Sequence, residues 1–103
     1  MAAGTSVTPS NSYGNFLTGS FVLDPASVAG GAAGTHTVAV AEAAIGDVAI
    51  ITSRTALTAG NVISNVRVSA AGTISFSTEN TTAGAIDEAS GTWDYALIRN
   101  RRR

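Results

Sequence analysis

The sequence contains no cysteine and no lysine. Without cysteine, the chain forms no disulfides and has neither a thiolate nucleophile nor a cysteine-based zinc or iron–sulfur site. Charged residues make up 13% of the chain, about half of the roughly 25% that is typical of soluble domains. No apolar run approaches the roughly 18 residues of a membrane-spanning helix, and the N-terminus lacks the basic start and apolar core of a signal peptide. We therefore expect no membrane association and no export.

The low charge has two interpretations. Serine, threonine, asparagine and glycine can supply the hydrated surface without charged groups. Alternatively, part of the surface is covered by a partner or by further copies of the chain, because charged residues are depleted at the core of such interfaces.

The few charges that are present are unevenly distributed. Residues 1–98 carry two arginines against seven acidic residues, a net charge of −5. The last five residues, 99–103, add four arginines. A basic tail on an acidic body is typical of tethering to an acidic surface or a neighbouring copy, or of a tail that is simply solvated.

The clearest structural signal is a β-hairpin over Val62–Asn80. Alternate residues of its first half are predicted to share one face: Val62, Ser64, Val66 and Val68. Ile74 and Phe76 share a face in the second half, and the short connection before Thr73 contains Gly72. A period of two predicts half-buried strands, and a short connection with glycine predicts the turn between them.

Four further segments have strand patterns: Phe16–Leu23, Thr35–Glu42, Val48–Ser53 and Trp93–Arg99. The nearly continuous apolar character of Val48–Ser53 predicts a central strand with both faces covered. Gly19 indicates a bulge in the first strand. Between the last two strands, Ile86 is expected to pack inward, and Asp87–Ser90 to form a single helical turn.

Six strands with turn signals between them, and no long helix, predict an all-β fold. We expect an antiparallel β-sandwich of about six to eight strands with Greek-key or jelly-roll-like connections. The polar segment 1–15 is predicted to be a flexible N-terminal arm. The sandwich domain is expected to span 16–99, and 100–103 to form a basic C-terminal tail.

The chain has few groups that could carry out catalysis. The single histidine, His36, is in phase with Val38 and Val40 of its strand, which favours a packed or edge residue over a catalyst. Asp87 and Glu88 are adjacent, which is more typical of a solvated loop than of an acid–base pair. No phosphate-binding glycine motif and no calcium-loop spacing is present. We therefore expect no enzymatic activity, no metal and no cofactor.

Two binding functions remain open from the residues alone. Trp93 and Tyr95 share a strand face and could stack on a sugar, although a place in the core is the simpler interpretation. The loop Thr81–Thr92 could recognise a glycan. The C-terminal arginines could contact phosphates, but no aromatic residues alternate with them and the acidic body would repel nucleic acid, so nucleic-acid binding is not expected.

Several pieces of the second half occur together in a known group of proteins. In order, they are Gly46-Asp47, Ala56-Leu57, Ala59-Gly60, Val68 to Thr73, Asn80 to Asp87, and Ala89 to Trp93. On these pieces the chain resembles small structural proteins encoded by tailed bacteriophages, including cyanophages. The resemblance covers a little over half of the sequence and does not include residues 1–34.

The resemblance implies a virion component: a β-sandwich module, commonly trimeric, that serves as a capsid decoration (cement) protein or as a fibre or knob. The length of 103 residues leaves little room for a fibre shaft, which favours decoration. We expect a homotrimer, made in the bacterial host cytoplasm, that binds the outer capsid surface between major capsid protein subunits and stabilises the head. The alternative is a fibre or knob that binds a host glycan. Expected contact residues are Tyr13, Phe16, Arg99, Arg101, Arg102 and Arg103.

Overall fold

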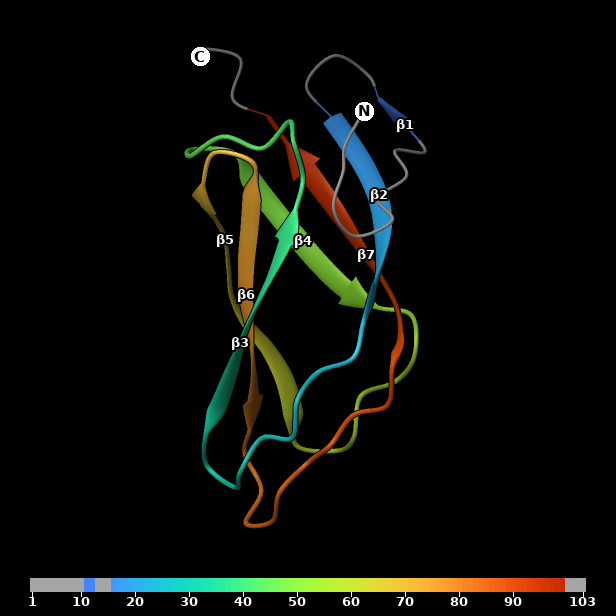
Figure 1. Cartoon of the computed structure of the whole chain (residues 1–103), viewed down its shortest axis with the longest axis vertical. Helices are drawn as coiled ribbons and strands as arrows, with labels where there is room; N and C mark the ends of the chain where they lie inside the picture. Colours follow the sequence, from blue (N-terminus) through green and yellow to red (C-terminus); the bar gives the residue numbers. More distant parts are fainter. Residues whose placement is uncertain (1–10, 13–15, 100–103) are drawn as a thin grey trace.

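The computed structural model describes residues 11–12 and 16–99, and within these residues the chain is all-β (Figure 1). The strands are β1 (Asn11–Ser12), β2 (Phe16–Leu23), β3 (Ala33–Ala39), β4 (Val48–Ser53), β5 (Asn61–Ala70), β6 (Thr73–Asn80) and β7 (Gly91–Ile98). The all-β prediction is confirmed, and β2 and β4 have the predicted bounds. The two residues of β1 belong to the segment predicted as an arm, and 100–103 lie outside the described residues.

The strands form two antiparallel sheets that pack face to face as a β-sandwich. One sheet has the order β1-β2-β7-β4 and the other the order β3-β6-β5. The first long strand, β2, pairs with the last, β7, and the second long strand, β3, pairs with the last but one, β6. This nested pairing is the jelly-roll-like wiring that the sequence left open beside a Greek key.

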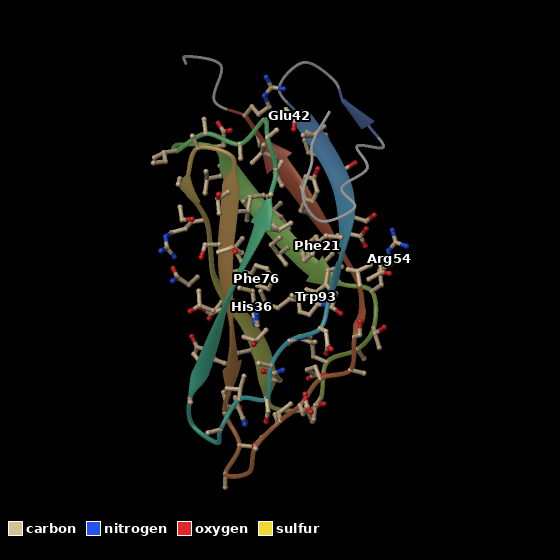
Figure 2. All side chains as sticks on the ribbon, viewed as in Figure 1. Phe21, His36, Glu42, Arg54, Phe76 and Trp93 are labelled. Atoms are coloured by element: carbon tan, nitrogen blue, oxygen red, sulfur yellow. The ribbon has the colours of Figure 1, made fainter. Side chains whose placement is uncertain are left out.

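The core lies between the sheets and is built from alternate residues of the strands. Its largest fully buried side chains are Trp93, Tyr95, Phe76, Ile74 and Leu97. The Phe76 ring lies near the centre, with its centroid 5.5 Å from that of Trp93 and 6.2 Å from that of Phe21 (Figure 2). The predicted inward face of the last strand is therefore confirmed.

The predicted hairpin is confirmed as β5 and β6, but the predicted common face of β5 holds only for its second half, where Val66 and Val68 face the core. A β-bulge shifts the pairing register between Ser64 and Arg67, and Asn65 adopts a φ of 52°. Because a bulge adds a residue to one strand, it reverses the alternation of side chains along that strand. Val62 is therefore exposed, and Ile63 packs against the core instead.

The prediction that Val48–Ser53 is a central strand is also wrong. Among the described residues, β4 is the end strand of its sheet and pairs only with β7. Its inward residue Ile51 is buried, but Val48 and Ile50 point outward and are about half exposed. A continuous apolar run does not distinguish a strand covered on both faces from one with an uncovered apolar face.

The predicted bulge at Gly19 is wrong, because every residue of β2 pairs with β7 without a register shift. Gly19 lies opposite Tyr95, and a Cβ atom added to it would come within 2.6 Å of the tyrosine hydroxyl. The glycine is therefore needed for close packing of the tyrosine ring rather than for a bend.

Asp87–Ser90 forms no helical turn. Its Glu88 carboxylate accepts hydrogen bonds from the Thr58 backbone N–H (2.7 Å) and from Asn61 (2.8 Å).

One buried amide organises the loop that follows β6. The Asn80 Nδ2 group donates to the carbonyl oxygens of Val28 (2.9 Å) and Gly84 (2.7 Å). The Asn80 Oδ1 atom accepts from the backbone N–H and the hydroxyl of Thr82. Ile86 is buried there and pairs with Val28, as the sequence predicts.

The position of His36 makes the stability of the sandwich pH-dependent. Its Nε2 atom lies 3.0 Å from the Thr78 hydroxyl, and burial lowers the pKa of His36 below its ordinary value of 6.5. Since the unfolded chain then binds a proton more readily than the folded chain, the free energy of unfolding should fall as the pH drops from about 7 to 5. Urea unfolding across this range should show the fall, and His36→Gln should flatten it. An unchanged slope in the variant would contradict this assignment.

Candidate functional site

Exposed apolar side chains gather on the outer face of the β1-β2-β7-β4 sheet. Because the residues of β2 and β7 that face the core alternate with outward residues, Phe16 and Ile98 both point away from the core. The pairing register places Phe16, Ile98 and Val48 side by side across three strands. Ile50 follows Val48 on the same face of β4. We call Phe16, Val48, Ile50 and Ile98 the apolar corner.

The apolar corner is a large exposed feature for such a small domain. Its side chains have exposed fractions of 37% at Phe16, 55% at Val48, 50% at Ile50 and 40% at Ile98. Single exposed apolar residues are ordinary, but a contiguous group typically marks a contact surface. The corner therefore has the composition expected of a surface that another protein covers.

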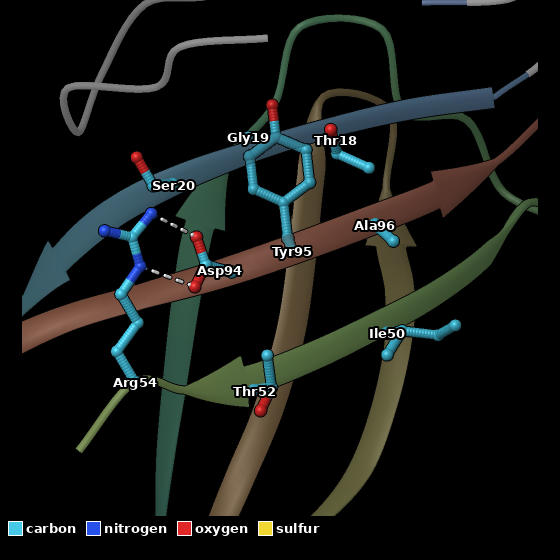
Figure 3. A pocket seen from close by; sticks show the side chains of 9 residues that line it. All are labelled: Thr18, Gly19, Ser20, Ile50, Thr52, Arg54, Asp94, Tyr95 and Ala96. Carbon is cyan, nitrogen blue, oxygen red and sulfur yellow. Dashed lines mark hydrogen bonds and ion pairs between the residues drawn. The ribbon is translucent and has the colours of Figure 1, made fainter. Parts of the chain in front are cut away.

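A hollow of about 430 Å³ lies beside the apolar corner on the same sheet (Figure 3). Its lining residues are Thr18, Gly19, Ser20, Ile50, Thr52, Arg54, Asp94, Tyr95 and Ala96. Two rungs of the sheet cross it: Thr18–Ala96–Ile50, and Ser20–Asp94–Thr52. The small Ala96 side chain lies on the middle strand, between longer side chains on both sides, which leaves the face hollowed there.

An ion pair closes one end of the hollow. Arg54 Nε donates to Asp94 Oδ2 and Arg54 Nη2 to Asp94 Oδ1, each at 2.8 Å (Figure 3). The hydrogen bonds from Arg54 lower the pKa of Asp94, and the attraction of the guanidinium adds to the shift against the opposing effect of burial. Because the two charges cancel, this end of the hollow is polar but has no net charge.

Beneath the hollow, Tyr95 belongs to the core. Its side chain is 2% exposed, and its hydroxyl has no hydrogen-bond partner among the residues that the structure describes. Burial, with a smaller effect from the Glu42 carboxylate, raises the pKa of Tyr95 to about 12. Trp93 is buried to the same degree. The idea that these two rings stack on a sugar is therefore wrong.

The outer face of the β3-β6-β5 sheet carries mainly hydroxyl-bearing side chains. Thr35 and Ser77 lie side by side on it, as do Thr37 and Ser75. Val62, 45% exposed, is a large apolar residue on that face. The two outer faces are thus unequal, since one carries a group of four apolar side chains and the other mainly hydroxyl groups.

The structure brings together only part of the predicted contact set. Phe16 lies in the apolar corner, and Arg99 follows β7 and is half-buried. Tyr13, Arg101, Arg102 and Arg103 lie outside the described residues. Val48, Ile50 and Ile98 were missed by the sequence analysis, as was the Arg54–Asp94 pair. The alternation of β4 and β7 was the available signal, but the interpretation of β4 as a central strand concealed it.

The groups considered for catalysis lie apart. His36 is on β3 against Phe76, whereas Glu88 is in the loop before β7 and binds Thr58 and Asn61. Within residues 16–99, no group of three or more histidine, aspartate or glutamate side chains could hold a metal ion. No helix in the part of the chain that the structure describes is long and apolar enough to cross a membrane.

Comparison with known proteins gives no match: no family model, no curated protein and no solved structure matches the chain.

Proposed function

We propose that the protein is a structural component of a bacteriophage particle, a capsid decoration (cement) protein without enzymatic activity. In this role it forms homotrimers, lies on the capsid surface between major capsid protein subunits and stabilises the head. The sequence resemblance over residues 46–98 supports the phage assignment. The observation on which the proposal mainly rests is the apolar corner, which is suited to burial against protein.

The charge distribution supports contact with copies of the chain through this surface. The chain carries six arginines against seven acidic side chains, a net charge of −1, so its overall charge opposes contact between copies only weakly. The apolar corner itself has no charged residue. Asp47 and Arg99, which adjoin Val48 and Ile98 in the chain, have opposite signs, and Arg54 and Asp94 are paired with each other. Copies can therefore approach there without bringing like charges together.

A protein that is repeated many times over a capsid surface does not require a large interface on each chain. Stable two-protein interfaces typically bury about 800 Å² on each partner. Four partly exposed side chains on a narrow sheet supply only a part of such an interface. Repetition over many equivalent positions can compensate, because linked copies bind with a high effective concentration.

Val48→Asp tests the proposal. We expect the unaltered protein to have the mass of about three chains by light scattering after size exclusion, and Val48→Asp to have the mass of one, because a carboxylate cannot be buried unpaired at the interface. Quantitative mass spectrometry of purified phage should find many copies of the chain per particle. With Val48→Asp, that number should fall at least tenfold.

Val62→Asp is the matched control. Val62 is exposed to a similar degree, but it lies on the outer face of the other sheet. This variant should keep the mass and the copy number of the unaltered protein. A single-chain mass for the unaltered protein would refute the trimer, and absence of the chain from purified particles would refute the virion role.

A further inference from the structure

The hollow has a mainly apolar lining with the Arg54–Asp94 ion pair at one end, and contact through the apolar corner does not explain that pair. We propose that the hollow is a binding site for a neutral saccharide. This inference does not depend on the proposed virion role, since it concerns a ligand of a different class and a site that shares only Ile50 with the apolar corner.

The ion pair is arranged to bind adjacent hydroxyl groups. Each Asp94 oxygen accepts one hydrogen bond from Arg54, which leaves further lone pairs on both oxygens. Arg54 uses two of its five N–H donors in this pair, and its side chain is 60% exposed. A donor site and an acceptor site thus lie next to each other and are held by a rigid pair. A vicinal diol offers the matching acceptor and donor.

The remaining walls suit the body of a sugar ring. Ala96 and Ile50 form an apolar floor on which the C–H face of a pyranose can lie. Hydroxyl-bearing residues border that floor on both neighbouring strands: Thr18 and Ser20 on β2, and Thr52 on β4. The volume of about 430 Å³ is within the range of small-ligand sites, roughly 300–1,000 Å³.

The Arg54–Asp94 ion pair favours binding of a neutral ligand over an ionic one. An anion would have to compete with Asp94 for the guanidinium. A cation would have to displace Arg54 from the carboxylate. A neutral polyol can bind both partners while the pair stays intact, so it avoids the cost of leaving one charge unpaired.

The expected affinity is modest. The aromatic ring that lines the hollow, Tyr95, is 2% exposed and offers no open face for stacking. Hydrogen bonds to an open, hydrated site each contribute little net free energy. We therefore expect dissociation constants in the millimolar range, about 4 kcal/mol of binding free energy, for single sugar units.

Nuclear magnetic resonance titration of the full-length chain tests the site. The probes are the methyl glycosides of glucose, galactose and mannose, with galacturonic acid as the anionic comparison. We expect saturable shifts of the Ser20, Thr52, Asp94 and Ala96 amide signals with at least one neutral glycoside, and a weaker response to galacturonic acid. The absence of saturable shifts with every neutral glycoside, or shifts centred away from the hollow, would overturn the proposal.

Two variants and one control assign the binding to the hollow. Ala96 is partly exposed and lines the hollow, so the larger side chain of Ala96→Leu should fill the hollow and abolish saturable binding. Thr52→Val removes one hydroxyl and should weaken binding about fivefold. Thr35→Val makes the same change on the outer face of the other sheet and should leave binding unchanged. Equal effects of Thr52→Val and Thr35→Val, or full binding by a folded Ala96→Leu variant, would refute the site.

Discussion

Replacing Phe76 with alanine is expected to lower the free energy of unfolding by about 3–5 kcal/mol. The side chain is 0% exposed, and its ring lies against those of Phe21, Trp93 and His36. Removing it leaves a cavity between two sheets whose backbones are fixed by their ladders, so the surrounding core cannot close completely. Because small domains are stable by only about 5–15 kcal/mol, the variant should be partly unfolded near 37 °C.

Urea unfolding followed by tryptophan fluorescence measures this loss, since Trp93 is the only tryptophan and lies in the same cluster. Phe16→Ala is the control, because it removes the same ring from a position that is 37% exposed. It should cost about 1 kcal/mol or less. Similar losses in the two variants would show that the core is not centred on Phe76.

Asn80→Ala should be the second most damaging change, with a loss of about 3 kcal/mol. The substitution removes one of the two donors from each of the Val28 and Gly84 carbonyls, which keep the Ile86 N–H and the Thr82 hydroxyl, and it leaves the Thr82 N–H without its acceptor. The site is buried, with Asn80 2% exposed, so water cannot readily replace the amide. Hydrogen exchange should also become faster in the loop between Thr81 and Ile86.

Asn65→Ala is the comparison for this prediction. Asn65 is exposed, and the alanine variant loses only the preference of asparagine for a positive φ, which costs about 1 kcal/mol. Asn80→Asp keeps an acceptor for Thr82 but places a buried carboxylate oxygen against the Val28 and Gly84 carbonyl oxygens, so it should be at least as destabilising as Asn80→Ala. If Asn80→Ala and Asn65→Ala were equally stable, the buried hydrogen bonds of Asn80 would not be the cause of the loss of stability.

The sequence predicted the positions of the strands better than it predicted what surrounds each strand. Alternation identified β2 and the β5–β6 hairpin because an antiparallel strand with one face in the core must repeat every two residues. It failed within β5, because nothing in the local pattern marks Asn65 as the position where a bulge reverses the faces. It also failed at β4, where the neighbouring strands, and not the sequence of β4, decide whether Ile50 is covered.

The candidate site was harder to predict for a related reason. The apolar corner and the hollow exist only in the register that aligns β2, β7 and β4. Arg54 and Asp94 are 40 residues apart in the sequence, and no local motif connects them. Phe16 was anticipated because it is an aromatic residue at the end of a polar segment, whereas Ile98 was interpreted simply as part of a strand.

The pairing of β2 with β7 has a consequence for how the protein is made. Phe16 lies opposite Ile98, so the ladder between β2 and β7 closes only after the chain as far as Ile98 has left the ribosome. Until then, β2 of the nascent chain lacks its β7 partner, and the core around its inward residues Leu17 and Phe21 is incomplete. Pairings this distant in sequence fold slowly, on the scale of milliseconds to seconds. Chaperone contact with β2 during synthesis, and loss of solubility on truncation before β7, are the expected cellular consequences of this wiring.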